Sequence, residues 1–511
     1  MSISVGSGSI SDMREQVLRK PASDVTVSQF VARPAAVRLD IPIGTATPIS
    51  GPVVSGLLGI FDAMVILGLG FASIFWITPD ADWQFAGVVV LLGTMLALNL
   101  LHLVGAYRFE RLGDIEFSAS QVLLAWFLIM GTILGLVAVA GAGHRSEHGW
   151  LVFWLAGGLL VLLAARIGLF FGMRAWQKSG RLCQNVVVIG AGTIGQTLLR
   201  HLNARPTPHV RILGVYDDRL GRLPARCMSY PILGTVDDLI VHARHHRIDQ
   251  VIVALPLSAD WRLSEIMNKL RLIPTDVRVC ADQFGFQLCA QDKHGNAEVP
   301  LLKVCDKPLR DWRWIGKEIE DRVIGALILV MIAPLMLAIA AAIKLDSPGP
   351  VFFRQKRYGY NNRLIEMLKF RTMYHHVQDP DAEQLTRRND PRVTRVGAFL
   401  RRTSLDELPQ FLNVLRGEMS IVGPRPHATR AKAGGHLYQD VVKGYDARHR
   451  MKPGITGWAQ VNRWRGETET VEQIVRRVEH DLYYIENWSI LWDIRIILRT
   501  AFGGFTGSSA Y

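Results

Sequence analysis

The stretch IGALILVMIAPLMLAIAAAI, residues 324–343, is long and apolar enough to enter a lipid bilayer. Pro334 lies at its centre, removes a helix hydrogen bond and therefore predicts a kink. Both flanks are basic, with Arg313, Lys317 and Arg322 before the stretch and Lys344, Arg354, Lys356 and Arg357 after it. A plain crossing would place one of these clusters outside, against the positive-inside rule. We therefore predict a bent, re-entrant membrane helix over 321–344, with a plain fifth crossing as the alternative that length alone supports.

Four further stretches, at roughly 53–77, 85–107, 117–141 and 149–173, are long and apolar enough to span a bilayer. They predict an α-helical membrane bundle over 51–175. Basic residues precede the first stretch and follow the second and fourth, whereas the other two loops hold only Arg145. The positive-inside rule therefore places both ends of the bundle in the cytosol. Residues 1–50 are polar and rich in Ser and Pro, which predicts a disordered cytosolic N-terminus without a cleavable signal peptide.

The composition favours a membrane enzyme over a nucleic-acid-binding protein. Of 511 residues, 49% are hydrophobic and 20% are charged, and the formal net charge is +13. Such a charge suits either nucleic acid or an anionic membrane with phosphate-bearing substrates, and the apolar spans decide for the membrane. The five cysteines include no CxxC pair, so neither a structural zinc site nor a disulfide framework is predicted.

Residues 184–300 have the pattern of a Rossmann-like α/β domain. A β-branched run at 186–189 precedes the loop GAGTIG at 190–195, a helical stretch follows, and the strand at 211–216 ends in Asp217. Strand, glycine loop, helix and terminal acid make a dinucleotide-type fingerprint. The candidate nucleotide-binding residues are Gly190, Gly192, Gly195 and Asp217, the last as a ribose contact. A catalytic Tyr-x-x-x-Lys is missing, so regulation or dimer assembly is a more reasonable role than a separate oxidoreductase activity.

A pair of acids marks the candidate catalytic site, in the run TSLDELPQ at 403–410. Pro409 is tolerated in the first turn of a helix but not inside one, so a helix is predicted to begin near Pro409. Asp406 and Glu407 then lie in the lead-in to that helix, where a carboxylate and a phosphate are favoured. The alternative is a structural capping box formed by Ser404 and Glu407.

Cations surround this pair in the sequence. Lys369 and Arg371 precede it, as do Arg392, Arg395, Arg401 and Arg402, and Pro424-Arg425-Pro426 follows it. Guanidinium groups hold phosphate oxygens through two bonds, so the set suits a diphosphate, although several of the arginines would also suit a solvated basic face. Two adjacent carboxylates repel each other unless a cation lies between them. A divalent metal at Glu407 and Asp406, most plausibly Mg²⁺, would remove that cost.

Five motifs recur together in one order. They are SPGPVFFRQ at 347–355, KFRTM at 369–373, TSLDELPQ at 403–410, VGPRP at 422–426 and KPGITGW at 452–458. Together they resemble the bacterial sugar transferase family, the monotopic polyprenyl-phosphate phosphoglycosyl transferases. The resemblance is dense over 317–511, and the bundle with its central α/β unit is similar to the large subgroup that starts exopolysaccharide or O-antigen synthesis. It implies a mainly α-helical transferase domain over 317–511.

The resemblance also implies roles for particular residues. Asp406 would attack the β-phosphate of a UDP-sugar, expel UMP and form a phosphoryl-aspartate, which undecaprenyl phosphate would then resolve. Glu407 would hold the metal or position the phosphates, and Arg401 would assist. The expected substrate-binding residues are Arg425 with its flanking Pro424 and Pro426, Lys369 and Arg354. Pro334 matches the helix-breaking proline of the family.

The expected partners are therefore a UDP-sugar, undecaprenyl phosphate and the lipid bilayer, with surface for a homodimer and without nucleic acid. The expected location is the bacterial inner membrane, with the site on the cytosolic face. Trp488, Trp492, Arg495 and Arg499 suggest a helix on the membrane surface. Two other functions stay open: a membrane-tethered dehydratase or epimerase that acts at the glycine loop, and a non-enzymatic assembly scaffold. The sequence does not identify the sugar.

Overall fold

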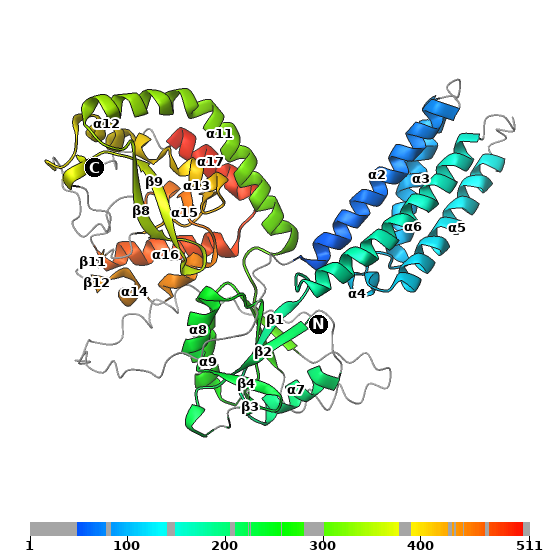
Figure 1. Cartoon of the computed structure of the whole chain (residues 1–511), viewed down its shortest axis with the longest axis horizontal. Helices are drawn as coiled ribbons and strands as arrows, with labels where there is room; N and C mark the ends of the chain where they lie inside the picture. The colour runs from blue at the N-terminus through cyan, green and yellow to red at the C-terminus, as the bar shows by residue number, and fades with distance from the viewer. Residues whose placement is uncertain are drawn as a thin grey trace. The chain divides into compact units, whose positions relative to one another are not determined.

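The computed structural model describes residues 49–77, 83–139, 149–204, 210–222, 224, 226–256, 258–280, 301–377, 390–427, 432–433, 436–442, 444–464 and 470–503. The predicted disordered N-terminus lies outside these ranges except for its last two residues. So do the loops at 78–82 and 143–147, on which the predicted orientation of the bundle depends. The chain forms a helical bundle, an α/β domain and a C-terminal domain (Figure 1).

The bundle consists of α2 (Gly51–Ile77), α3 (Trp83–Leu103), α5 (Ile115–Val139) and α6 (Gly149–Lys178), with the short α4 (Phe109–Leu112) between α3 and α5. All four long helices are long and apolar enough to cross a membrane, and they cover most of the four predicted stretches. The indole of Trp154 donates to the Ile66 carbonyl at 2.7 Å, and that of Trp126 donates to the Leu155 carbonyl at 2.9 Å. These bonds tie α6 to α2 and α5 to α6.

One ion pair is buried inside this apolar bundle. The Arg166 guanidinium of α6 donates to the Asp62 carboxylate of α2 at 2.7 Å, and both side chains are almost fully buried. Tyr107 donates to the same carboxylate at 2.9 Å. A charge in such surroundings is stable only when it is paired and hydrogen-bonded. The pair therefore holds α2 and α6 in one register.

The described strands of the α/β domain form one sheet in the order β3-β4-β2-β1-β5-β6-β7. The strands are β1 (Gln184–Ile189), β2 (Val210–Tyr216), β3 (Arg226–Cys227), β4 (Tyr230–Gly234), β5 (Gln250–Val253), β6 (Asp276–Cys280) and β7 (Leu301–Cys305). The strands β4, β2, β1, β5 and β6 pair in parallel, while β3 and β7 are antiparallel edges. The helices are α7 (Thr193–Ala204), α8 (Val236–His245) and α9 (Asp260–Leu270), and the turn η2 (Leu220–Arg222) follows β2. The predicted strands at 186–189 and 211–216 are confirmed as parts of β1 and β2.

The three glycines of the loop between β1 and α7 differ in what surrounds them. Gly190 has φ of +106°, and a Cβ there would lie 2.6 Å from the Ala254 carbonyl oxygen. A Cβ on Gly195 would lie 2.0 Å from the Gly190 carbonyl oxygen, whereas one on Gly192 would meet only the tip of Arg219 at 3.7 Å. Gly190 and Gly195 are therefore required by packing, and Gly192 is not.

This difference gives a paired test. Gly195→Ala should destabilise the α/β domain by about 1–3 kcal/mol, because backbone must shift to admit the methyl group. Gly192→Ala should leave stability unchanged to within about 0.5 kcal/mol. Thermal unfolding and limited proteolysis of the detergent-solubilised full chain measure both. A Gly195→Ala protein as resistant as wild type would contradict the packing described for this loop.

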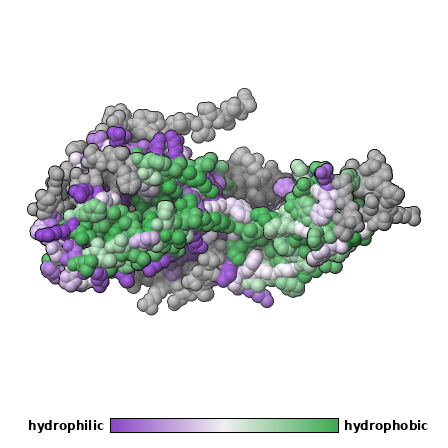
Figure 2. Space-filling view, turned by 90° about the horizontal axis from the view of Figure 1, so that it is seen from above, coloured by the Kyte–Doolittle hydropathy of each residue, from purple (hydrophilic) through white to green (hydrophobic). Residues whose placement is uncertain are grey.

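The C-terminal domain begins with α11 (Asp311–Asp346), a continuous helix that contains Pro334 and is bent (Figure 1). It starts ten residues before the predicted 321. The prediction began too late because the first turns of the helix are charged and lie outside the apolar stretch. Lys317 is buried there, bound to Asp493 at 2.5 Å and to Asp321 at 3.1 Å. The middle of the helix exposes large apolar side chains, among them Leu327, Val330, Met331 and Leu337. Figure 2 shows hydrophobic surface gathered over this side of the domain.

Both arms of α11 pack against the same domain. The first arm contacts α13 (Gln410–Leu415), β10 (Ser420–Val422) and α17 (Ile490–Gly503). In the second arm, Ile339 and Ile343 pack with Phe370 and Leu400 in one apolar cluster. Arg371 fixes the end of the helix, since its guanidinium donates to the carbonyls of Ser347 at 2.6 Å and Pro348 at 2.8 Å. The exposed apolar bend therefore lies between two anchored arms.

The rest of this domain is mainly helical. A hairpin of β8 (Phe352–Tyr358) and β9 (Leu364–Phe370) precedes α12 (Arg395–Thr403), η5 (Leu405–Glu407) and α13, and β10 pairs in parallel with β13 (Gly454–Thr456). The remaining helices are α14 (Tyr438–Val441), α15 (Trp458–Val461), α16 (Val471–Glu486) and α17. Short elements complete it: η3 (Tyr360–Asn362), η4 (His375–Val377), β11 (Lys432–Ala433), β12 (His436–Leu437) and η6 (Tyr445–Arg450). An α/β sheet region and a helical C-terminal domain are thus as predicted.

Candidate active site

The acidic pair lies on a tight connection between two helices. Ser404 ends α12 in the left-handed conformation, with φ of 57°, and the single turn η5 carries Asp406 and Glu407. Pro409 is the residue before α13, so the predicted helix start near Pro409 is confirmed. The flanking Leu405 and Leu408 pack against the apolar cluster of Ile339, Ile343, Phe370 and Leu400. This packing fixes the turn and buries the Asp406 side chain.

Two cations hold the Glu407 carboxylate. Arg425 donates to both oxygens, at 2.7 Å and 3.2 Å, and the Lys369 ammonium lies 3.0 Å from one of them. Lys369 comes from β9 and Arg425 follows β10, so three separate elements meet at this carboxylate. At Ser404 the turn has no side-chain cap hydrogen bond, and the capping-box alternative is therefore wrong.

The backbone of Arg425 is itself fixed by neighbouring residues. Pro424 and Pro426 flank it, and its carbonyl accepts a hydrogen bond from the buried Arg448 at 2.8 Å. Arg448 in turn pairs with the buried Asp481 of α16 at 2.5 Å. Arg448 and Asp481 were not predicted from the sequence, because their role depends on a contact between separate segments. The local sequence carries no signal for this pair, since Arg448 lies in the polar run DARHR at 446–450 and Asp481 directly follows Glu479 and His480.

The two acids have opposite electrostatic surroundings. Burial raises the pKa of Asp406, and Lys369 opposes this shift while the neighbouring Glu407 adds to it. Burial would also raise the pKa of Glu407, but Arg425 and Lys369 outweigh it and hold that pKa well below the usual range. Glu407 therefore stays ionised at neutral pH, whereas Asp406 takes up a proton more readily. Paired carboxyls with separated pKa values are typical of catalytic sites.

The other predicted residues differ in their distance from this pair. Arg401 of α12 is close enough to lower the pKa of Asp406, and its Nε donates to the Thr372 hydroxyl at 2.9 Å. Arg354 is opposite Leu368 in the hairpin, so it lies on the other face from Lys369. Its side chain is 72% exposed and faces Glu366 at 3.6 Å. The structure thus brings together Asp406, Glu407, Lys369, Arg401 and Arg425, and leaves Arg354 outside the group.

The donor set at the pair can be compared with that of a magnesium site. Mg²⁺ is commonly held by one or two carboxylates together with substrate phosphate oxygens. Asp406 and Glu407 fit that pattern, although Glu407 already has two cationic partners. Among the described residues, three or more His, Cys, Asp or Glu side chains do not gather into a metal-binding group. An ion here would therefore depend on oxygens from the substrate.

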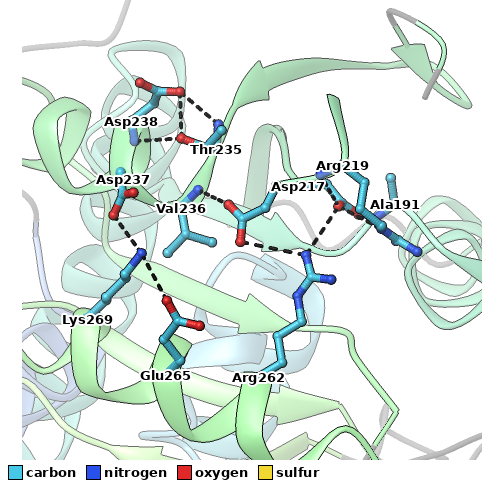
Figure 3. A network of polar contacts seen from close by, with 11 residues as sticks. Ala191, Asp217, Arg219, Thr235, Val236, Asp237, Asp238, Arg262, Glu265 and Lys269 are labelled. Atoms are coloured by element: carbon cyan, nitrogen blue, oxygen red, sulfur yellow. Dashed lines mark hydrogen bonds and ion pairs between the residues drawn. The ribbon is translucent and has the colours of Figure 1, made fainter. Parts of the chain in front are cut away.

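The glycine loop is a second candidate site, in the α/β domain. Asp217 is buried, and its carboxylate accepts hydrogen bonds from the Ala191 backbone at 2.9 Å and from Arg219 at 2.7 Å (Figure 3). Burial alone would raise the pKa of Asp217, but these bonds lower it to about 2. A ribose hydroxyl could reach this carboxylate only by displacing one of those partners. Nucleotide binding at Gly190, Gly192, Gly195 and Asp217 therefore stays a prediction.

Known proteins resemble this chain over most of its length. Residues 312–507 match the family described as bacterial sugar transferase, and residues 102–281 match one described as CoA-binding domain. The chain is 34% identical to the UDP-glucose:undecaprenyl-phosphate glucose-1-phosphate transferase of Xanthomonas campestris pv. campestris, over 89% of this chain and 94% of that protein.

Two further relatives bear on the reaction and on the sugar. The chain is 39% identical to the transferase of the same name from Escherichia coli (strain K12), over 76% of this chain and 81% of that protein. A UDP-N-acetylgalactosamine-undecaprenyl-phosphate N-acetylgalactosaminephosphotransferase from Aeromonas hydrophila is 41% identical over 37% of this chain and 44% of that protein. The named sugar therefore differs among the relatives.

The contact between Glu407 and Arg425 can be tested by a double-mutant cycle. Glu407→Gln, Arg425→Met and the double variant should give a coupling free energy of about 1–3 kcal/mol, measured by denaturant unfolding at neutral pH. The exposed Arg354–Glu366 pair, treated identically, should give less than about 0.5 kcal/mol.

The coupling should also depend on pH in one direction. The folded-state pKa of Glu407 is depressed, so the ion pair stabilises the fold above the unfolded carboxyl pKa of about 4.3. This stabilisation is lost as pH falls from there toward the folded-state pKa. If the coupling free energy stays constant when the pH is lowered below about 4, the assigned ion pair is contradicted.

Proposed function

This chain belongs to the bacterial sugar transferase family, and from that premise we propose that it moves a sugar-1-phosphate from a UDP-sugar to undecaprenyl phosphate through a covalent aspartate intermediate. The chain is a transferase of the polyprenyl-phosphate sugar phosphotransferase kind, and the dehydratase, epimerase and scaffold alternatives are set aside. The observation that carries the finer proposal is the asymmetric pair, with Asp406 beside an ionised Glu407 that two cations hold.

The proposed reaction has two displacements. An Asp406 carboxylate oxygen attacks the β-phosphorus of the UDP-sugar, the bond from that phosphorus to the bridging oxygen breaks, and UMP leaves with the electron pair. A phosphate oxygen of undecaprenyl phosphate then attacks the same phosphorus, and Asp406 is released with the carboxylate restored. The product is undecaprenyl-diphosphate-sugar. Dividing one displacement into two is covalent catalysis, for which ping-pong kinetics are expected.

The surrounding side chains suit this chemistry. Lys369 and Arg401 lower the pKa of Asp406 against the effect of its burial, which keeps a larger fraction of the nucleophile ionised. Arg425, together with Lys369, would bind phosphate oxygens of the donor, as guanidinium and ammonium groups do elsewhere. Asp406 and Glu407 would hold Mg²⁺ with the help of substrate oxygens. Bound there, the ion would supply charge stabilisation to the phosphoryl group.

We further propose that α11 is re-entrant. Support comes from the packing of both arms on the same domain, with the exposed apolar bend at Pro334 between them. Such a helix would place the acidic pair at the membrane surface, where a lipid phosphate meets a soluble nucleotide sugar. The apolar face of α17, with Leu491, Leu498 and Phe502 exposed, suits the same surface. The inner membrane, the cytosolic side and a homodimer complete the proposal, on the flanking charges and the available surface alone.

The nucleophile is tested with purified membranes, labelled UDP-sugars and undecaprenyl phosphate. Asp406→Asn should lower formation of lipid-linked sugar by at least about 10³-fold, because an amide cannot form the intermediate. Brief incubation with donor labelled in the β-phosphate should label the wild-type protein but not the variant. Undiminished product from Asp406→Asn would exclude this residue as the nucleophile. Ala398→Ser, an exposed change on α12, serves as a control that should retain full activity.

The re-entrant helix is tested by accessibility. Leu345 near the end of α11 is 89% exposed, and a cysteine there should be labelled by an impermeant thiol reagent only when the cytosolic face is open. Trp83→Cys at the start of α3, after one predicted crossing, should be labelled from the opposite side. The unmodified chain gives the background from the native cysteines. Labelling of Leu345→Cys from the same side as Trp83→Cys would indicate a plain crossing.

A further inference from the structure

The acidic pair is one edge of a larger cluster of buried and half-buried charges. Residues that influence one another's pKa across it come from the hairpin, α12, the segment after β10, η6 and α16. The cations are Arg357, Lys369, Arg401, Arg425, Arg448 and Arg477, and the carboxylates are Asp406, Glu407 and Asp481. His427, which is buried among the arginines, is held neutral because burial and then Arg448 lower its pKa far below the usual value. Positive charge is therefore in excess among the described residues.

Arg357 lies in this cluster without a carboxylate partner among the described residues. Lys369 and Arg425 share Glu407, and Arg448 pairs with Asp481. The Arg357 guanidinium donates to the neutral Gln355 amide oxygen at 2.6 Å, and no carboxylate of the described residues lies within ion-pair distance of it. Its Nε is buried without a hydrogen-bond partner in the described ranges. Burial, and next Arg425, lower the pKa of Arg357 to about 10.

The hairpin register places Arg357 on the side of the acidic pair. Arg357 is opposite Ile365 and Gln355 is opposite Met367, and these positions share one face with Lys369. Arg354 and Lys356 lie on the other face. A half-buried arginine that faces a cationic site, with a buried Nε that has no hydrogen-bond partner and with no acid beside it, is costly unless an anion joins it.

We propose that Arg357 binds phosphate oxygens of the donor's diphosphate and is thereby a further substrate-binding residue. This inference rests on the proposed function, which it deepens. The guanidinium offers two donors in a fork that matches a phosphate, and the excess charge of the cluster is offset when a diphosphate enters.

The placement favours the donor over the lipid phosphate. Leu405 and Leu408 flank the pair and pack on the second arm of α11, which makes that side apolar. Glu407, Lys369 and Arg425 form a cationic side, and Arg357 belongs to it. A lipid acceptor that arrives along α11 reaches Asp406 from the apolar side. A soluble nucleotide sugar has its diphosphate on the cationic side.

The test compares Arg357→Met with Arg357→Lys and with Lys356→Met, the neighbouring cation on the other face of the same strand. Arg357→Met should raise the KM for UDP-sugar and the Kd for UDP by about 10–100-fold, the loss expected for charge-assisted bonds. Arg357→Lys should recover part of the affinity, because it retains charge but not the fork. The KM for undecaprenyl phosphate should stay within about twofold of wild type. Lys356→Met should match wild type throughout.

Equilibrium binding of UDP separates this inference from the proposed function, because it needs no turnover. Unchanged UDP affinity in Arg357→Met would overturn the inference, even if lipid-linked sugar is formed normally. A change confined to the KM of undecaprenyl phosphate would also overturn it and assign Arg357 to the acceptor. If Arg357→Met unfolds at a lower temperature than wild type, Arg357→Lys decides, and an unchanged UDP affinity in that variant counts against the proposal.

Discussion

The C-terminal domain is arranged around the Glu407 carboxylate and its ion pairs with Lys369 and Arg425. This interaction joins the hairpin, the turn after α12 and the segment after β10, through contacts between residues 38 and 18 positions apart in the chain. It also settles the electrostatics of the acidic pair, since one carboxyl is kept ionised and its neighbour is left with the raised pKa. Without this contact, no cationic partner would distinguish the pKa of one adjacent carboxyl in the turn from that of the other.

The domain secures this contact from two directions. On one side Arg371 binds the carbonyls at the end of α11, and the apolar cluster of Ile339, Ile343 and Leu400 fixes the turn. On the other side Asp481 holds Arg448, which holds the backbone of Arg425. The cations proposed to bind the substrate are thus positioned by residues to which no such role is assigned. Pre-organised charge of this kind is what phosphoryl transfer requires, because little else is left for the protein to do.

Local patterns explain which features the sequence could predict. The four spans follow from uninterrupted apolar length, and the start of α13 follows from the backbone of Pro409 alone. Lys369, Arg425, Asp406 and Glu407 could be gathered as candidates because short motifs contain them. The early start of α11 was missed, since a charged turn is stable there only because Lys317 meets Asp493, 176 residues away. Arg357 and Arg448 depend in the same way on strand register and on distant partners, which composition does not reveal.

The ion pair inside the helical bundle has a consequence for how this protein can change over generations. Because Asp62 and Arg166 are each buried against the other, loss of one leaves the other charged and uncompensated among apolar side chains. Neither residue can be replaced alone without this cost. Substitutions at this level of α2 and α6 are therefore expected to occur jointly. The two helices are separated by more than 70 residues of chain. At this level their substitutions are nevertheless expected to occur and be inherited together.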